Sequence, residues 1–261
     1  MSSLTALLVL SSSLMAQTSY RTNPDRTLTY PFDTPIRTSI VDLGPSPYYP
    51  GLKPPHIRLS CFVFSQFVVK EYDEGQKGAE WLAIVPLTTQ DHGQCAQSHV
   101  AGERVIDGGE WCGYFKGVKR NFVFFNACDG TNGGLPFAVY DSRTGKKVFE
   151  DSAYDWSRWG QKAEDSPFSR LRISKVQAGP LLLKYLRVVE AECDLHIEKA
   201  SCWDRLRVKL DLRSTKIPFC SGYQNISGEA VSMVAYPVSV YLAFPPVVKT
   251  IAGPVRCWAP D

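Results

Sequence analysis

Short runs of apolar and aromatic residues alternate with turn-forming residues along most of this chain. The clearest example is the stretch 109–152, which contains three such runs, at 111–115, 122–125 and 137–140. Short β-rich runs separated by Gly, Asn and Asp are typical of antiparallel strands, because turns need residues that tolerate positive φ. We place the turns of this stretch at 116–117, 129–134 and 141–145, the last closing a hairpin with a bulge at Gly145.

Further β-rich runs lie on both sides of this stretch. Residues 57–71 predict one long strand, 72–75 an acidic turn, and 81–85 the partner strand of a hairpin. Near the end of the chain, 231–244 and 247–258 predict two or three more strands. The fold class that follows is all-β and mostly antiparallel, a disulfide-stapled β-sandwich or barrel.

The strictest alternation of apolar and polar residues occurs in 189–198 and 202–212. Apolar side chains occupy every second position there, apart from Asp204, which predicts two strands that each have one buried and one solvent-facing side. The solvent-facing sides are acidic on the first strand and basic on the second, which suits cross-strand ion pairs. This assignment places Val208 on the buried side and Trp203 on the solvent side.

Cys193 and Cys202 bear on how these two strands would meet. In a hairpin that runs to its turn, the two sulfurs would be offset beyond the roughly 7 Å of Cα separation that a disulfide allows. Either the strands end early around a wide loop that this bridge closes, or both cysteines bond to other parts of the sheet. We favour the first alternative because a nearby partner costs less loop entropy.

Cysteine usage and the N-terminus both predict export. All eight cysteines follow the first sixty residues, their number is even, and none form a C-x-x-C pair, so four structural disulfides are expected. Residues 1–10 are apolar and uncharged, and small residues follow up to Ala16. This pattern predicts a signal peptide over 1–16, although no Lys or Arg precedes the apolar core; the alternative is a disordered or packed N-terminus. The apolar run is too short for a transmembrane segment.

Composition divides the chain into three parts and argues against one class of partner. The signal peptide 1–16 is followed by a polar, proline-rich segment over 17–55 and a single β-rich domain over 56–261; the alternative is one domain with a small appended one. The net charge is +3, and the basic cluster 205–209 alternates like a solvated strand face. No nucleic-acid partner is therefore expected.

A metal site is a weaker interpretation of one polar segment. His92, Cys95 and His99 lie in 88–103 at spacings that can bring three ligands to one ion. In an exported protein, Cys95 is instead expected to form a disulfide, which leaves the segment a polar loop. We expect no metal and no cofactor.

The candidate ligand site is an aromatic group in 153–169, a segment that is either a loop or one short helix. Tyr154, Trp156 and Trp159 alternate there with Asp155 and Arg158. Sugar rings stack on exposed aromatic faces, and Arg158 can add hydrogen bonds. The competing interpretation is a loop that its tryptophans pin to the sheet.

Enzymatic activity has less support in the sequence. The motifs G-x-S-x-G, H-E-x-x-H and the phosphate loop do not occur. Carboxylates that a glycosidase could use as a pair are plentiful in the middle of the chain, at Asp107, Glu110, Glu150, Asp151 and Asp155. We therefore expect a secreted or periplasmic binding or structural module for a polysaccharide or another cell-surface ligand, with a secreted glycosidase-like hydrolase as the alternative.

Overall fold

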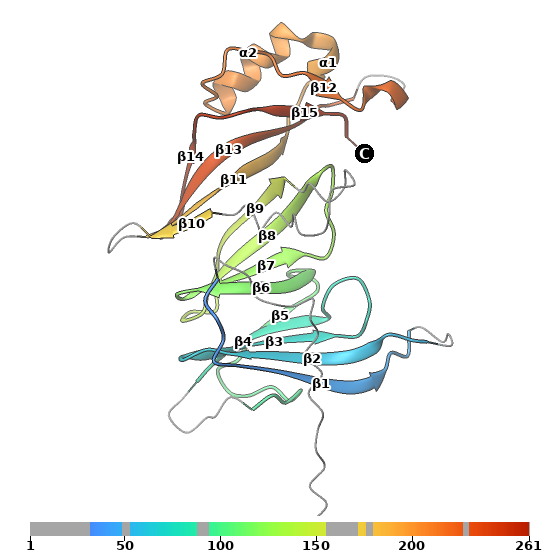
Figure 1. Ribbon diagram of the computed structural model, residues 1–261, viewed down its shortest axis with the longest axis vertical. Helices are drawn as coiled ribbons and strands as arrows, with labels where there is room; N and C mark the ends of the chain where they lie inside the picture. Colours follow the sequence, from blue (N-terminus) through green and yellow to red (C-terminus); the bar gives the residue numbers. More distant parts are fainter. Residues whose placement is uncertain are drawn as a thin grey trace, which may run out of the picture.

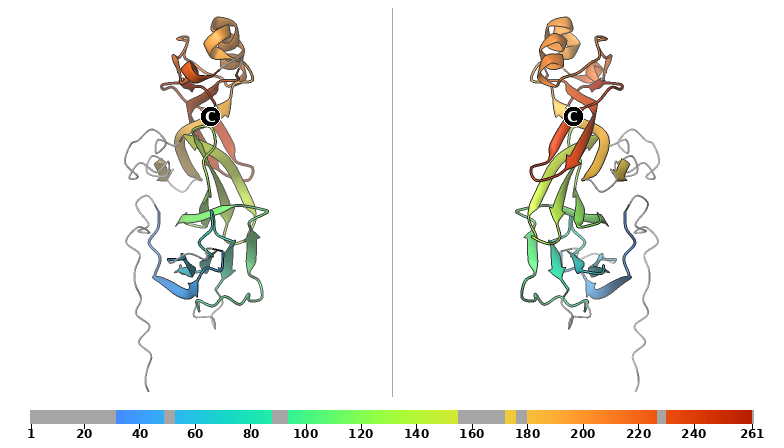
Figure 2. Two further views of the ribbon diagram at one scale, coloured as in Figure 1. Left: turned by 90° about the vertical axis from the view of Figure 1, so that its right-hand side faces the viewer. Right: turned by 90° about the vertical axis from the view of Figure 1, so that its left-hand side faces the viewer.

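The computed structural model describes residues 32–48, 53–87, 94–154, 172–175, 180–226 and 230–260. It shows two mostly antiparallel sheets, of five and ten strands, and a small helical layer. Figures 1 and 2 show an elongated molecule, with the five-stranded sheet at one end and the helices at the other. The predicted β fold is confirmed, and neither sheet closes into a barrel in the part of the chain that the structure describes.

The five-stranded sheet is an antiparallel meander with its strands in chain order: β1 (Arg37–Pro45), β2 (His56–Val63), β3 (Phe67–Asp73), β4 (Trp81–Pro86) and β5 (Arg104–Asp107). Strand β1 falls inside the segment 17–55 and pairs with β2. The prediction of one long strand over 57–71 is wrong, because the chain folds back between β2 and β3. The exposed pair Ser65 and Gln66 forms that turn, and the apolar runs on both sides of it are buried.

The ten-stranded sheet begins with the predicted central strands: β6 (Gly113–Lys119), β7 (Phe122–Ala127), β8 (Gly134–Asp141) and β9 (Lys147–Tyr154). Gly145 has a φ of +65° and donates its N–H to Asp141 O at 2.8 Å, with a register shift beside it, so the hairpin with a bulge is confirmed. The turn that we placed at 116–117 is wrong. Gly117 lies at a bulge within β6, and the chain turns three residues later, at Arg120 and Asn121.

The rest of this sheet comes from the second half of the chain: β10 (Arg172–Lys175), β11 (Leu181–Glu190), β12 (Cys220–Ser221), β13 (Met233–Leu242), β14 (Val247–Thr250) and β15 (Arg256–Trp258). The strands predicted over 231–244 and 247–258 are confirmed as β13, β14 and β15. Strand β11 pairs with β13 along its whole length but with β9 at one residue pair, Arg187 and Ala153. The two halves of the sheet are therefore joined by a short contact.

The helical layer contradicts the two strands predicted over 189–198 and 202–212. The chain forms α1 (Leu195–Glu198) and α2 (Ala200–Lys209) there instead. Asp194 begins α1 by accepting hydrogen bonds from His196 N and Ile197 N, at 2.8 and 3.0 Å. On α2 the buried residues are Cys202, Trp203 and Leu206, a helical spacing that outweighs the twofold alternation. With ten residues α2 is the longest helix described, well short of the roughly 20 apolar residues of a membrane span.

All eight cysteines form disulfides, as predicted: Cys61–Cys95, Cys112–Cys128, Cys193–Cys202 and Cys220–Cys257. The favoured pairing of Cys193 with Cys202 is thus confirmed, although the bridge links α2 to the residue before the α1 cap rather than two strands. Each pair lies within one sheet or its attached layer. The bridges therefore reinforce local units of the fold.

The two sheets pack through a shared apolar core and a covered strand edge. Phe62, Leu82, Phe125 and other apolar residues of β2–β5 and β6–β8 form the core between them. At the edge of β6, Ala79 N donates to Gly113 O at 2.9 Å, and Glu71 Oε2 accepts from Phe115 N at 2.7 Å. These contacts satisfy backbone groups that an open edge would leave unpaired. They fix the end of β6 relative to the five-stranded sheet.

Candidate functional site

The structure describes one member of the predicted aromatic ligand site. Tyr154 is the last residue of β9, and its ring is buried against Trp258 at a centroid distance of 5.0 Å. The guanidinium carbon of Arg256 lies 5.3 Å from the centroid of the same ring. Trp156, Arg158 and Trp159 lie outside the described residues. Tyr154 therefore belongs to the core between β9 and β15, and the ligand role of the group stays a prediction.

The described residues of the metal site that the sequence suggested have other partners in the structure. Cys95 is bonded to Cys61, so its sulfur is not a thiolate ligand. His99 Nδ1 lies 3.1 Å from Glu103 Oε1, and its ring meets Trp81 edge-on. His92 lies outside the described residues. Within the residues that the structure describes, no group of three His, Cys, Asp or Glu is placed to hold a metal ion.

Two of the candidate catalytic carboxylates have structural partners. Asp107 Oδ1 accepts hydrogen bonds from the backbone N–H groups of Gly109 and Glu110, both at 3.0 Å, and so closes a turn. Asp151 is buried, accepts a hydrogen bond from Arg187 Nε at 2.8 Å and is in contact with the hydroxyl of Tyr185. Burial raises the pKa of Asp151, and the hydrogen bonds and Arg187 only partly oppose this. The fifth candidate, Asp155, lies outside the described residues.

Glu110 contacts Tyr140, and the charge of Glu150 acts on the same side chain. The hydroxyl of Tyr140 donates to Glu110 Oε1 at 3.1 Å. Burial is the main reason that the pKa of Tyr140 is raised, and the charges of Glu110 and Glu150 both add to it. Arg104 Nη2 binds Glu110 at 2.5 Å, and Lys147 Nζ binds Glu150 at 2.6 Å. The two carboxylates are thus close enough to influence one phenol, and each is held by a cation.

A larger feature with the character of a ligand site is a cavity of about 600 Å³ where three turns meet. We call it the junction cavity. Its lining comes from the β2–β3 turn (64–67), from the end of β6 and its turn (118, 120 and 121), from Arg143 in the β8–β9 turn, and from residues 33, 34 and 36 ahead of β1. Small-molecule sites typically measure about 300–1,000 Å³, so this cavity has the size of one.

The hydrogen bonds between the turns hold the junction cavity in shape. Ser142 N donates to Asn121 O at 2.8 Å and so joins the β8–β9 turn to the β6–β7 turn. Asp33 N donates to Val118 O at 2.7 Å, and the Asp33 carboxylate accepts from Arg120 N at 2.6 Å. Arg120 has a φ of +57°, in the left-handed region that a tight two-residue turn requires. These backbone hydrogen bonds thereby fix the backbone positions from which the lining side chains extend.

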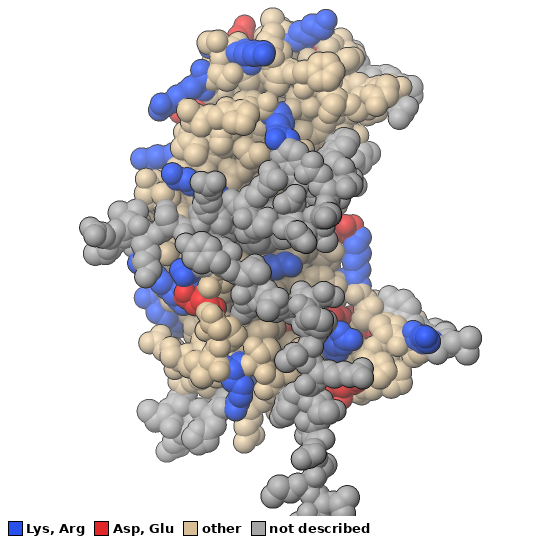
Figure 3. Space-filling model, in the orientation of Figure 1, with Lys and Arg blue, Asp and Glu red and all other residues tan. Residues whose placement is uncertain are grey.

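The lining combines planar polar side chains with apolar ones. Arg120, Asn121, Arg143 and Gln66 supply amide and guanidinium groups, and the side chain of Ile36 is exposed beside them. The rings of Phe64 and Phe67 stack at a centroid distance of 5.2 Å and are buried beneath. Figure 3 shows Lys and Arg side chains gathered around an acidic one on this left side of the molecule, at the height where the sheets meet. The site is therefore polar and rich in positive charge, with an apolar base.

Sequence reasoning missed these residues. The signal available for Arg120 and Asn121 was the break in apolar character between Val118 and Phe122, which marks the turn more correctly than Lys116 and Gly117 do. No sequence pattern joins that turn to Arg143 or to the turn at 64–67. Their meeting depends on how the two sheets pack.

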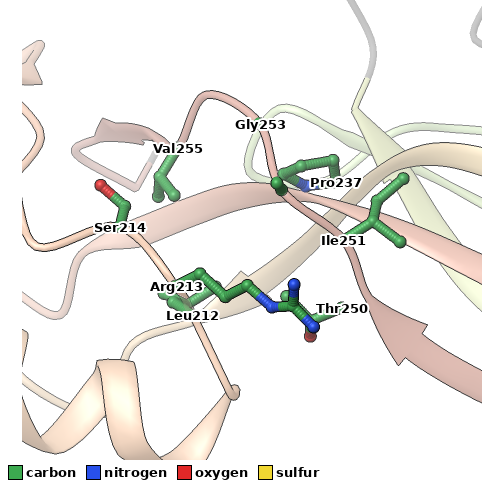
Figure 4. A pocket seen from close by; sticks show the side chains of 9 residues that line it. Leu212, Arg213, Ser214, Pro237, Thr250, Ile251, Gly253 and Val255 are labelled. Carbon is green, nitrogen blue, oxygen red and sulfur yellow. The ribbon is translucent and has the colours of Figure 1, made fainter.

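A second cavity, of about 210 Å³, lies between the segment after α2, the middle of β13 and the segment that follows β14 (Figure 4). Pro237, Ile251 and Val255 give it a mainly apolar lining. The hydroxyl of Thr250 is used within the protein, where it donates to Leu210 O at 2.7 Å. This cavity is smaller than typical ligand sites, so the junction cavity is the better candidate.

Comparison of the chain with protein-family models, with curated proteins and with solved structures found no match. The geometry of the junction cavity is therefore the basis for a functional proposal.

Proposed function

We propose that this chain is an exported binding protein, that the junction cavity is its ligand site, and that its ligand is a carbohydrate from a polysaccharide or another cell-surface component. The observation that carries the proposal is the cavity itself, which has ligand size and a lining of planar polar groups beside apolar ones. A cavity with only a packing role would be apolar and closed.

The lining chemistry suits a sugar ring. The hydroxyl groups of a sugar both donate and accept hydrogen bonds, and the side chains of Gln66, Thr34 and Ser65 can do the same. The C–H faces of a sugar need an apolar surface, which Ile36 offers at the edge of the cavity. A purely apolar ligand would leave the polar groups unpaired, at a cost of about 1–3 kcal/mol for each buried one.

Export is supported by the four disulfides, which persist in oxidising compartments, and by the apolar segment at 1–16. We expect cleavage after Ala16 and a secreted or periplasmic location. N-terminal sequencing of the protein recovered from the culture medium or periplasm tests this, and a retained Met1 would contradict it.

The binding site can be tested by filling the cavity. Ser65 is an exposed residue of the β2–β3 turn that lines the junction cavity, and Ser214 lines the second cavity. Ser65→Trp should abolish retention on a polysaccharide gel and binding of oligosaccharides in calorimetry, whereas Ser214→Trp should bind like the wild type. Equal binding by both variants would place the ligand site elsewhere.

The predicted aromatic group is tested in the same assay. If Trp156 and Trp159 form a binding platform, Trp156→Ala and Trp159→Ala should weaken retention and barely change unfolding. If they anchor a loop, each truncation should instead cost roughly 3–5 kcal/mol of stability. A large loss of stability in both variants would remove the support for this group as a ligand site.

A second candidate function, a glycosidase-like hydrolase, is favoured by two carboxylates that act on Tyr140: Glu110 through a hydrogen bond and Glu150 through its charge. Glycosidases use two carboxyl groups on opposite sides of the bond that they cleave. The test is turnover of a panel of chromogenic glycosides. Activity that Glu110→Gln and Glu150→Gln both abolish would favour the hydrolase, and retention without turnover would favour the binding protein.

A further inference from the structure

We propose that the ligand of the junction cavity carries a carboxylate, as an acidic sugar does, and that Arg143 binds it. This inference rests on the proposed function of the cavity and specifies its ligand. Its basis is the way in which Arg143 is held at the cavity, together with a second guanidinium group, that of Arg120, in the same lining.

Asp141 orients the side chain of Arg143. Asp141 is 1% exposed, and its carboxylate accepts from Arg143 Nε at 3.1 Å and from Arg143 Nη2 at 2.7 Å. Arg143 N also donates to Asp141 Oδ1 at 2.9 Å. The guanidinium group therefore meets Asp141 with its Nε edge. Because the group is planar and rigid, its Nη1 edge points away from Asp141.

The charge state of this pair is stable. Burial alone would raise the pKa of Asp141, but the hydrogen bonds from Arg143 and Asn121 outweigh it and lower the pKa. Asp141 therefore ionises more readily than an ordinary aspartate. The guanidinium stays oriented before a ligand arrives, which reduces the entropy lost on binding.

The acidic residue of the lining, Asp33, is already paired with a cation. Asp33 accepts hydrogen bonds from Lys119 Nζ at 2.7 Å and from Arg120 N at 2.6 Å. It would therefore repel an incoming anion only weakly. Arg120 is exposed and lines the cavity together with Arg143, so it adds positive charge there. Arg143 is paired with Asp141 and contributes the hydrogen-bond donors of its other edge.

A carboxylate is the anion that best fits this arrangement. An arginine edge matches the two oxygens of a carboxylate with two parallel hydrogen bonds. The side chain of Gln66 and the hydroxyls of Thr34 and Ser65 remain for the hydroxyl groups of the same sugar. The geometry therefore favours a sugar acid over a neutral sugar, whose hydroxyl groups do not exploit the charge.

The experiment compares two probes that differ only in the carboxylate: methyl glucuronide and methyl glucoside, with the galacto pair as a repeat. Calorimetry should find the acid bound about tenfold more tightly, because hydrogen bonds to charged groups are the stronger ones. Arg143→Gln should remove this preference. Arg213→Gln is the matched control, since Arg213 is an exposed arginine that lines the second cavity. It should keep the preference, and added NaCl should reduce it.

The outcomes separate the inference from the proposed function. If acid and neutral sugars bind the wild type equally, the inference fails while the binding function stands. If none of the probes binds at millimolar concentration, both fail. The sugar acid can also be displaced with inorganic phosphate or with a second sugar acid. If phosphate displaces it equally well, the site binds anions in general and the inference is overturned. Should Arg143→Gln unfold because it leaves Asp141 unpaired, the double variant Asp141→Asn/Arg143→Gln removes both charges and gives the same test.

Discussion

For two substitutions on α2, the structure predicts effects on stability that are opposite to those predicted by the twofold alternation of the sequence. Trp203 is 2% exposed in the structure, and Val208 is 80% exposed. In a pair of alternating strands, Val208 would be buried and Trp203 would face solvent. The helix therefore predicts a large loss of stability for Trp203→Ala and almost none for Val208→Ala.

The size of the difference follows from burial. Removal of a buried tryptophan typically costs about 3–5 kcal/mol, because contacts are lost and a cavity remains. For a chain of this size, this corresponds to a fall in Tm of roughly 6–20 °C. Val208→Ala should stay within about 0.5 kcal/mol of the wild type, since a surface residue is removed and alanine favours the helix.

Trp203→Phe refines the test. Trp203 Nε1 is buried and has no hydrogen-bond partner among the described residues, so its desolvation is uncompensated. Phenylalanine keeps most of the ring and removes this donor, and it should cost less than about half of the loss caused by alanine. The measurement is urea unfolding followed by circular dichroism with the disulfides intact. A larger loss for Val208→Ala than for Trp203→Ala would refute the helical packing.

Three further predictions concern covalent, electrostatic and backbone features. Thiol titration under denaturing, non-reducing conditions should find almost no free thiol, and reduction should cost about 2–5 kcal/mol per native bridge; two or more free thiols would contradict the four pairs. Because the pKa of Asp151 is raised in the folded state, its contribution to stability is present below its ordinary value of 3.8 and is lost as the pH rises through the raised value. The difference in the free energy of unfolding between the wild type and Asp151→Asn, wild type minus variant, should therefore fall as the pH rises through that window. If this difference rises instead, the pKa of Asp151 is lowered in the folded state. Gly133→Ala should destabilise the protein, because Gly133 has a φ of +76° and a Cβ there would lie 2.8 Å from Trp258 Nε1; unchanged thermal unfolding would show that this backbone can relax.

Local patterns in the sequence were sufficient to predict the class of fold and many of its strands, turns and disulfides. The runs at 122–125 and 137–140 became β7 and β8, and Gly145 took the left-handed position at the hairpin bulge. These features depend on neighbouring residues alone, because a turn is decided by the few residues that form it. The even number of dispersed cysteines likewise predicted four disulfides without a structure.

Local patterns failed where one segment fits both the twofold period of a strand and the period of a helix, because burial then decides between the two. Residues 202–212 satisfy a twofold alternation, and Cys202, Trp203 and Leu206 also satisfy a helical one. Asp194 starts the helical segment, and the burial of Trp203 against the sheet selects the second period. The break between β2 and β3 was missed for a related reason. Both strands are buried on two faces, so their residues show no alternation that would mark the turn at Ser65 and Gln66.

The junction cavity was decided by tertiary structure alone. Its lining comes from residues 33–36, 64–67, 118–121 and 143, which no local pattern connects. Their meeting depends on the register of β7 with β6 and with β8, and on the packing of both sheets over one apolar core. The sequence indicates most of the strands, because alternation and turn formation depend on neighbouring residues. The site exists because distant turns are brought to the same end of two packed sheets.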